Sequence, residues 1–291
     1  MSQGRTDGRR VSSIPVGYDR EGRRIRVRRR RKSHPGEVVL YPIVDGPGVA
    51  ALVMMPPFLA VMTLPVIDLF ATFNEKNALN PILLLMIPFT LPMVFCFAMV
   101  MGYFLLFIGR ILAAGAMGED DHPRWPHWDT GEIAAGLARW IWAGATGLFV
   151  GGAPAVWFWL ECGEVDLVDG FIFIDLVILG ATYALMGIAS ALLHENLIAC
   201  NPVTIIQSIV RVGWDYVSPC TTAVFGIATS SLAWGYVLFH APNAFVGVLG
   251  MWVCWIWTLY QLMVIFRALG LTYYRHAERL DWFRKPPPWG M

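Results

Sequence analysis

The chain has 291 residues, of which 56% are hydrophobic and 15% charged, and its formal net charge is +1. This number of charged residues is too small to cover the surface of a soluble globule of this length. The composition therefore excludes an ordinary soluble domain and indicates a membrane protein. The five cysteines form no Cys-x-x-Cys pair, which gives no support to a zinc ribbon or a disulfide framework.

Residues 1–46 form a basic segment with twelve basic and five acidic residues. We expect this segment to be cytoplasmic and largely disordered, with a small hairpin around Arg24 to Arg28 as the alternative. Its most basic run can contact anionic lipid headgroups, at about 1 kcal/mol for each residue near the leaflet. Nucleic-acid binding is disfavoured because no aromatic platform accompanies the run. The run contains Arg23, Arg24, Arg26, Arg28, Arg29, Arg30, Arg31 and Lys32.

Six apolar stretches follow, each long enough to cross about 30 Å of hydrocarbon. They lie near residues 48–70, 81–108, 138–160, 171–193, 217–239 and 244–268. If they alternate across the bilayer, Lys76 alone among the 22 Lys and Arg residues falls in an outer segment. Because basic residues are retained on the cytoplasmic side, both termini are predicted to lie inside a plasma (inner) membrane.

The predicted fold is therefore an all-α integral membrane protein with six transmembrane helices, for which three hairpins are one arrangement. The membrane domain spans residues 47–270, and residues 271–291 form a cytoplasmic tail. Each of three inner segments contains a Trp next to an Asp. Trp residues are typical anchors at the membrane interface, and a repeated hairpin unit would also place one such pair in each segment. These pairs are Trp128-Asp129, Trp214-Asp215 and Asp281-Trp282.

Two carboxylates and several prolines fall inside the apolar stretches. Asp68 and Asp175 lie near the outer ends of the first and fourth stretches, and an ionisable residue at membrane depth faces protein or water. Both are therefore candidates for an ion path, although hydration from the nearby outer boundary is the competing explanation. The prolines of the first three stretches predict kinks, which a transport pathway would use and which ordinary membrane helices also contain.

The loop after the second stretch holds four carboxylates and two imidazoles between Glu119 and Asp129. Carboxylates and imidazoles suit several transition metals, so four of these residues are candidate metal ligands. The spacing matches no established metal motif. A solvated acidic turn, in which Asp129 caps the next helix together with Glu132, is the competing interpretation. The candidate ligands are Glu119, Asp120, His122 and His127.

The residues around this loop resemble a known family. The similarity rests on Gly102-Tyr103, on Arg110-Ile111-Leu112, and on Gly118-Glu119-Asp120 followed by Pro123 and Trp128. This pattern is similar to domain of unknown function 4013, a family of multi-pass bacterial and archaeal membrane proteins with a G-E-D-x-x-P signature after a span. The resemblance is clear over about residues 95–160 and looser to 216. It implies a helical membrane domain, no activity and no catalytic residue. It marks only motif positions: Gly118, Glu119, Asp120, Pro123 and Trp128.

The third stretch contains Gly147-x-x-x-Gly151, a spacing that permits close packing against another helix without identifying the partner.

A further helix is predicted between the fourth and fifth stretches, over Asn201 to Tyr216. Asn201 can cap it, and Pro202 suits the first helical position. One narrow polar stripe runs along an otherwise apolar helix, so we expect the helix to lie on the cytoplasmic membrane surface, with burial against the bundle as the competing explanation. The stripe consists of Thr204, Gln207, Ser208, Arg211 and Asp215.

The outer loops are short, whereas the inner segments carry the basic and amphipathic elements. We therefore expect a non-enzymatic protein that interacts with membrane lipids or with a membrane protein partner, or that organises the bilayer, and that needs no cofactor. A small-solute transporter is the alternative function, and a metal-assisted membrane enzyme is the third.

Overall fold

The computed structural model describes residues 16–18, 24–26, 35–44, 46–74, 81–118, 123, 125–162, 166–240, 243–280 and 282. The side chains of residues 65–90 and of both strands lie outside this description. Two short strands, β1 (Val16–Tyr18) and β2 (Arg24–Arg26), pair antiparallel, with Gly17 opposite Ile25. The small hairpin, which was the alternative to disorder around Arg24 to Arg28, is therefore formed. The other residues of 1–34 lie outside the described part of the chain.

All the longer elements are helical. They are α1 (Pro35–Val44), α2 (Gly46–Asn74), α3 (Pro81–Met117), α4 (Thr130–Gly147), α5 (Ala153–Glu161), α6 (Leu167–His194), α7 (Pro202–Val212), α8 (Val217–His240) and α9 (Ala244–Leu280). Three short helical turns join some of them: η1 (Leu148–Gly152), η2 (Leu197–Cys200) and η3 (Gly213–Tyr216). Helix α1 lies within the segment expected to be largely disordered, and the last turns of α9 occupy the start of the predicted tail.

Within the described residues, six helical segments are long and apolar enough to cross a membrane, so the chain is an all-α, multi-pass membrane protein. The segments are Gly46–Leu64, Leu91–Met117, Thr130–Glu161, Leu167–His194, Pro202–His240 and Phe245–Ala277. The third consists of α4, η1 and α5. Its π-helical turn η1 ends just before Pro154, where the missing backbone donor disturbs the regular helical ladder.

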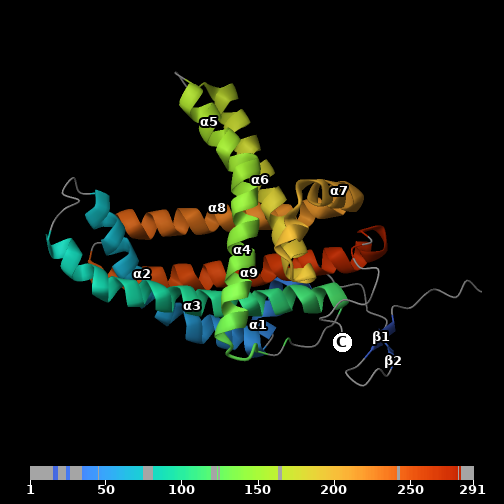
Figure 1. Cartoon of the computed structure of the whole chain (residues 1–291), viewed down its shortest axis with the longest axis horizontal. Helices are drawn as coiled ribbons and strands as arrows, with labels where there is room; N and C mark the ends of the chain where they lie inside the picture. The colour runs from blue at the N-terminus through green and yellow to red at the C-terminus, as the bar shows by residue number, and fades with distance from the viewer. Residues whose placement is uncertain are drawn as a thin grey trace, which may run out of the picture.

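The spans pack as three consecutive hairpins: α2 with α3, α4–α5 with α6, and α8 with α9. Helix α9 also packs extensively on α3. Helix α4 contacts both α3 and α6 and so connects the first hairpin to the second. Figure 1 shows α8 and α9 running side by side, with α4 and α6 crossing them and α5 projecting beyond. The hairpins are therefore not all parallel to one another.

The core lies where α3 and α9 meet. Its fully buried side chains come from one face of each helix, at spacings of three and four residues. They include Phe104, Phe107, Ile108, Ile111 and Leu112 of α3, and Leu259, Met263 and Phe266 of α9. Gly115 and Gly270 let the two backbones meet, because a Cβ atom on Gly270 would lie 3.0 Å from the Gly115 Cα atom. Small residues at such a crossing are what close packing of membrane helices requires.

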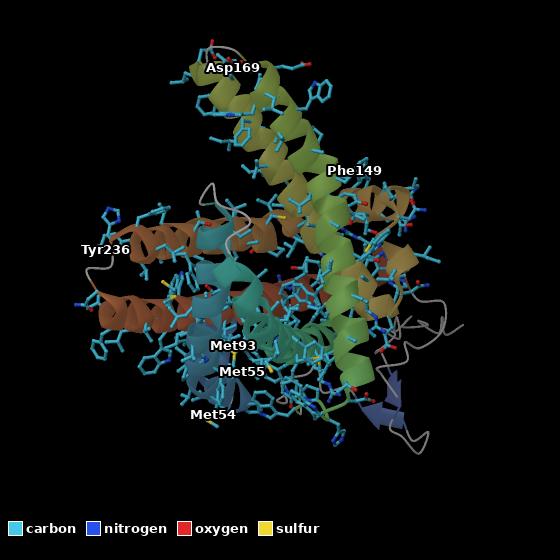
Figure 2. The ribbon with its side chains drawn as sticks, turned by 60° about the vertical axis from the view of Figure 1, so that its left-hand side comes forward. Met54, Met55, Met93, Phe149, Asp169 and Tyr236 are labelled. Carbon is cyan, nitrogen blue, oxygen red and sulfur yellow. The ribbon has the colours of Figure 1, made fainter. Side chains whose placement is uncertain are left out.

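The hairpin of α4–α5 and α6 is built on the same principle. Gly147 and Gly151 face Gly180, where an added Cβ atom would lie 2.9 Å from both the Gly147 carbonyl oxygen and the Gly151 Cα atom. The sequence predicted a close contact at Gly147 and Gly151, and the structure supplies its partner, α6. Opposite this contact the hairpin is apolar and exposed: Figure 2 shows Phe149 pointing outward and Asp169 at the tip.

Tryptophan–threonine hydrogen bonds join the helices inside the bundle. Trp234 Nε1 donates to Thr258 Oγ1 at 3.2 Å, and Trp257 Nε1 donates to Thr229 Oγ1 at 3.1 Å, so two bonds cross between α8 and α9. Where lipid surrounds the protein, bonds of this kind contribute about 0.6 to 2 kcal/mol each. They help to fix the register of the α8–α9 hairpin.

Candidate functional site

The predicted metal loop is described only in part. Glu119, Asp120 and His122 lie outside the described residues, and His127 is exposed. Among the residues that the structure describes, no group of three or more His, Cys, Asp or Glu side chains could hold a metal ion. Metal binding by this loop therefore stays a prediction.

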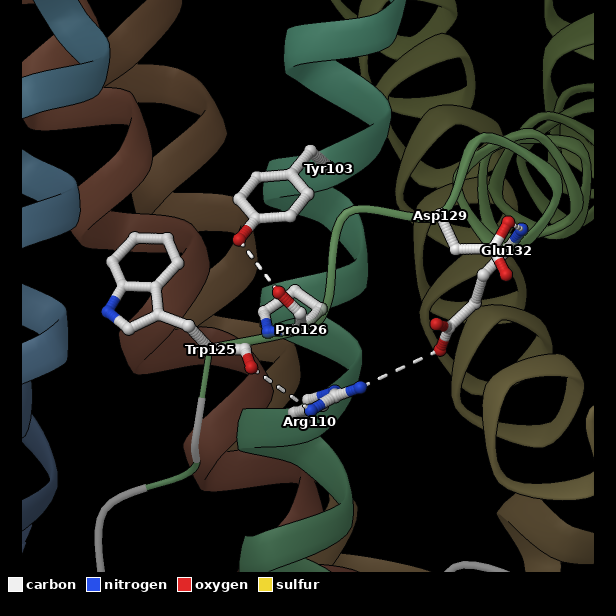
Figure 3. Close-up of polar contacts among 6 residues, drawn as sticks. All are labelled: Tyr103, Arg110, Trp125, Pro126, Asp129 and Glu132. Atoms are coloured by element: carbon white, nitrogen blue, oxygen red, sulfur yellow. Dashed lines mark hydrogen bonds and ion pairs between the residues drawn. The ribbon is translucent and has the colours of Figure 1, made fainter.

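The end of the loop is fixed to α3 and α4 by polar contacts (Figure 3). Tyr103 Oη donates to the Pro126 carbonyl at 2.8 Å. The Arg110 guanidinium donates to the Trp125 carbonyl at 3.4 Å and lies 3.7 Å from the Glu132 carboxylate. Arg110 thus bridges the helix before the loop and the helix after it.

Asp129 caps α4, as the sequence predicted. Its Oδ1 atom accepts hydrogen bonds from the backbone nitrogen of Gly131 at 2.8 Å and of Glu132 at 3.4 Å. The Glu132 carboxylate forms an ion pair with Arg110. Its negative charge in the first turn of α4 also suits the positive end of the helix dipole. The cap by the Asp129 side chain is confirmed, whereas the Glu132 side chain, expected to complete it, lies against Arg110 of α3.

The motif positions that are described have structural roles. Gly118 ends α3 with φ +68°, and a Cβ atom there would lie 2.7 Å from the Tyr274 ring, so both the backbone and the space favour glycine. Pro123 is buried. Trp128 packs on Tyr103 with ring centroids 5.1 Å apart and is still 61% exposed. These residues shape the loop and its aromatic surface and form no chemical centre.

Only one of the two ion-path candidates has a described side chain. The side chain of Asp68 lies outside the description, whereas Asp175 is exposed on α6. Asp175 lines an open hollow of about 470 Å³ on the surface of that helix, with Thr182 and four apolar neighbours. An outward-facing carboxylate gives no support to a path through the described bundle.

Helix α7 begins as the sequence predicted. Asn201 Oδ1 accepts a hydrogen bond from the backbone nitrogen of Val203 at 3.0 Å, and Pro202 occupies the first turn. Gly213, with φ +64°, ends the helix and turns the chain into η3. Residues 201–216 therefore form one short amphipathic unit between α6 and α8.

Part of the polar side of α7 contacts the end of α9, while Gln207 on the same side is exposed. Trp282 Nε1 donates to Ser208 Oγ at 2.9 Å, and Arg211 donates to the Leu280 carbonyl at 2.9 Å. Ser208 is 2% exposed. We call these contacts, together with the ion pair described next, the α7–α9 latch.

An ion pair completes the latch. His276 Nε2 lies 3.0 Å from the Asp215 carboxylate, and His276 Nδ1 lies 3.1 Å from the Thr272 carbonyl oxygen. Because both ring nitrogens face acceptors, the protonated imidazolium can donate to both. The Asp215 side chain is 64% exposed, so this pair adds little to stability and mainly sets the orientation of η3.

Four large apolar side chains, three of α7 and one of η3, are uncovered, and we call them the α7 apolar stripe. Val203 is 61% exposed, Ile206 55%, Val210 74% and Trp214 89%. A soluble amphipathic helix turns such residues inward and its polar residues outward. In α7 the apolar Ile205 and Val212 are buried against the protein together with Ser208, whereas the apolar stripe faces away from it.

The sequence did not reveal the partner of α7. Thr204 to Asp215 were grouped correctly by helical periodicity, but nothing in the pattern named Leu280 or Trp282 as their contacts. The available signal was the Asp281-Trp282 pair, which is typical of an interfacial anchor and also fits a repeated hairpin unit. In the structure Trp282 packs on His194 and Tyr273, with ring centroids 5.3 and 5.2 Å away.

Comparisons of the chain with protein-family models, with curated proteins and with solved structures found no match. The similarity to domain of unknown function 4013 therefore stays a prediction that rests on the residues around the loop.

Proposed function

We propose that this protein is a non-enzymatic membrane protein that binds and organises lipid at the cytoplasmic boundary of the plasma (inner) membrane. The α7 apolar stripe supports this function, because an exposed row of Val203, Ile206, Val210 and Trp214 suits insertion between lipid headgroups and acyl chains. The latch supports it as well, since Ser208 and Arg211 of α7 have protein partners at the end of α9, and these contacts leave the apolar stripe uncovered.

The energy available from insertion is substantial. Complete burial of one Val or Ile side chain is worth about 1.5 to 3 kcal/mol. Val203, Ile206 and Val210 are each more than half exposed, so their transfer into lipid would stabilise the attachment of α7 by several kcal/mol in total. Trp214, at the end of the stripe, suits the headgroup region.

The charge distribution supports the sidedness of the proposal. α7 connects α6 to α8, on the same side as the basic N-terminal segment if the six spans alternate. The run from Arg23 to Lys32 would attract anionic headgroups to this side of the membrane. Lipid would thus be held by charge at the N-terminal segment and by apolar contact at α7. Both termini lie in the cytoplasm in this account.

A fluorescence experiment tests the position of α7. Cys96 and Cys162, which are not buried, are replaced by alanine to give the parent protein. Val210→Cys and Gln207→Cys are then labelled separately with an environment-sensitive fluorophore in nanodiscs containing phosphatidylglycerol. We expect blue-shifted emission at position 210, quenched by lipids that carry spin labels.

Position 207 is the matched control, because Gln207 is exposed on the polar side of the same helix. Its fluorophore should instead be quenched by iodide in the aqueous phase. Equal iodide quenching at positions 207 and 210 would show that α7 lies in water, which would contradict the proposal. Labelling of the parent protein measures any background from the buried cysteines.

The other two functions gain no supporting observation in the described part of the chain. Transport would use carboxylates inside the bundle, and Asp175 faces outward. Metal chemistry would use Glu119, Asp120 and His122, which the structure does not describe. Lipid organisation is the function that the described contacts support best.

A further inference from the structure

Helix α7 lies in the chain between two membrane spans. The apolar segment that contains it, Pro202–His240, has 39 residues, or about 58 Å of helix, which is roughly twice the thickness of the hydrocarbon. Gly213, with φ +64°, breaks this segment, and the 24 residues of α8 are enough to cross by themselves. Because α6 ends just before α7 and α8 follows η3 directly, connectivity keeps α7 at the boundary of the bilayer, where lipid is available to an uncovered apolar side chain.

Both ends of α7 are fixed to α6 by buried tyrosines. Tyr183 Oη of α6 donates to the carbonyl of Cys200, at the end of η2, at 2.9 Å. Tyr216 Oη, at the end of η3, donates to the Thr182 carbonyl of α6 at 2.7 Å. The α7–α9 latch holds the helix as well. Buried hydrogen bonds of this kind favour one arrangement of the groups they join, so α7 is a fixed part of the bundle and does not move freely toward or away from the lipid.

The unit of residues 201–216 carries no net charge. Its charged residues are Arg211 and Asp215, and these contact the Leu280 carbonyl and His276 of α9. Gln207, the other exposed polar side chain of α7, is uncharged. Helices that are attracted to anionic membranes carry many Lys and Arg residues on their polar face, at about 1 kcal/mol for each one near the surface. Lipid charge therefore contributes little at α7, and the apolar stripe has to supply the binding.

A fixed apolar helix in one leaflet takes up area between the headgroups, and the lipid has to provide that area. For this reason, the insertion of amphipathic helices depends on curvature and lipid composition. We infer that α7 is a fixed wedge that selects loosely packed lipid, with small headgroups and unsaturated chains, irrespective of lipid charge. This inference rests on the proposed function and names the class of lipid that α7 takes. The basic run from Arg23 to Lys32 responds to charge instead.

Four nanodisc compositions separate packing from charge. The fluorophore at Val210→Cys, in the parent protein without Cys96 and Cys162, is compared in palmitoyl-oleoyl-phosphatidylcholine and in a mixture of dioleoyl-phosphatidylcholine with dioleoyl-phosphatidylethanolamine. Each composition is prepared with and without phosphatidylglycerol of the same chains. We expect a larger blue shift and stronger quenching by spin-labelled lipid in the dioleoyl mixture, and no change when phosphatidylglycerol is added.

Two variants of the labelled protein test the reasons for this behaviour. Gln207→Lys places a cation beside the apolar stripe, so phosphatidylglycerol should now increase the ratio of inserted to water-exposed fluorophore by about 5-fold, the equivalent of roughly 1 kcal/mol. Tyr216→Phe keeps the buried ring and removes the hydroxyl that donates to Thr182. Helix α7 should then adapt to the lipid, and the difference between the two chain compositions should shrink.

The outcomes distinguish this inference from the proposed function. Insertion that follows phosphatidylglycerol without Gln207→Lys, or that is equal in all four compositions, would overturn the inference and leave lipid binding by α7 in place. Iodide quenching at position 210 in all four compositions would overturn both. An unchanged dependence on packing in Tyr216→Phe would overturn the role of Tyr216 in fixing the wedge.

Discussion

Trp282 is the side chain that connects the end of the described chain to the polar side of α7. Its indole N–H donates to Ser208, and its ring packs on His194 and Tyr273. Ser208 in turn donates to the Thr204 carbonyl at 2.7 Å, so the serine hydroxyl is both donor and acceptor. These contacts, together with the burial of Ile205 and Val212, leave the α7 apolar stripe on the outside.

Trp282→Ala should release the end of α9. Loss of the ring contacts and of the Ser208 hydrogen bond should lower the free energy of local opening by about 2 kcal/mol, which is below the range for a fully buried aromatic side chain because this ring is only partly buried. Hydrogen exchange of the amides in residues 276–280 should accelerate by roughly 30-fold.

Trp282→Phe is the matched control for that prediction. It keeps an aromatic ring and removes the donor to Ser208, so the acceleration should be roughly 5-fold, from about 1 kcal/mol for one hydrogen bond. Equal and small effects of both substitutions would show that Trp282 does not hold the latch.

Helical periodicity was enough to identify the polar stripe of α7, but not to determine what the stripe faces. The spacing of Ser208, Arg211 and Asp215 is the same whether water or protein lies opposite. Their partners Trp282, Leu280 and His276 are 74, 69 and 61 residues away in the sequence, and local pattern carries no information on such a contact. The Asp129 cap was predictable, because its partners are its own neighbours.

The α4–α6 hairpin depends on the close approach of two helices. Gly147 and Gly151 indicated from sequence that some helix packs closely here. They could not identify α6, because a small-residue spacing describes one surface and not its partner. The second apolar stretch was predicted to end near residue 108, whereas α3 continues to Met117, and its last turns pack against α9 at Gly270. Hydropathy gives no information on that contact.

Gly151→Ala should destabilise the protein by about 1 to 3 kcal/mol, the usual cost of adding a group to a packed contact. A methyl group there overlaps the backbone of Gly180 and the Leu176 carbonyl, and neither can rotate away. The measurement is the free energy of unfolding by titration with sodium dodecyl sulfate.

Gly144→Ala is the control on the same helix. Nothing lies within 4 Å of a Cβ atom at position 144, so the only effect is the better helix propensity of alanine, a gain of up to about 1 kcal/mol. A stable Gly151→Ala protein would contradict the packing of α4 against α6.

At the scale of the whole molecule, composition and apolar length predicted the class of fold and the six spans. The crossing of the α4–α6 hairpin over α8 and α9 (Figure 1) was not predictable, since hydropathy gives the length of a span while packing sets its tilt. The unequal distribution of basic and acidic residues along the chain predicts the orientation of the protein in the membrane. Four acidic residues fall in 161–169, and the basic run falls near the N-terminus.

Cys162 lies in the acidic segment that the account places outside the cell. Desolvation, and then the carboxylates of Asp169 and Asp166, raise the pKa of its thiol above the ordinary value. The thiolate is the reactive form, so a raised pKa leaves less of it at neutral pH and the labelling rate climbs as the pH increases. Labelling of Cys162 therefore needs mildly alkaline buffer and a long reaction time.

Sidedness is tested most directly by a thiol reagent that cannot cross the membrane of intact cells. The account predicts that Cys162 is modified from outside. It also predicts that a cysteine introduced by Ser12→Cys, in a protein whose Cys96 and Cys162 are alanine, is modified only after the cells are permeabilised. Modification of position 12 in intact cells, with Cys162 protected until permeabilisation, would reverse the orientation and place α7 and the basic segment on the outer surface.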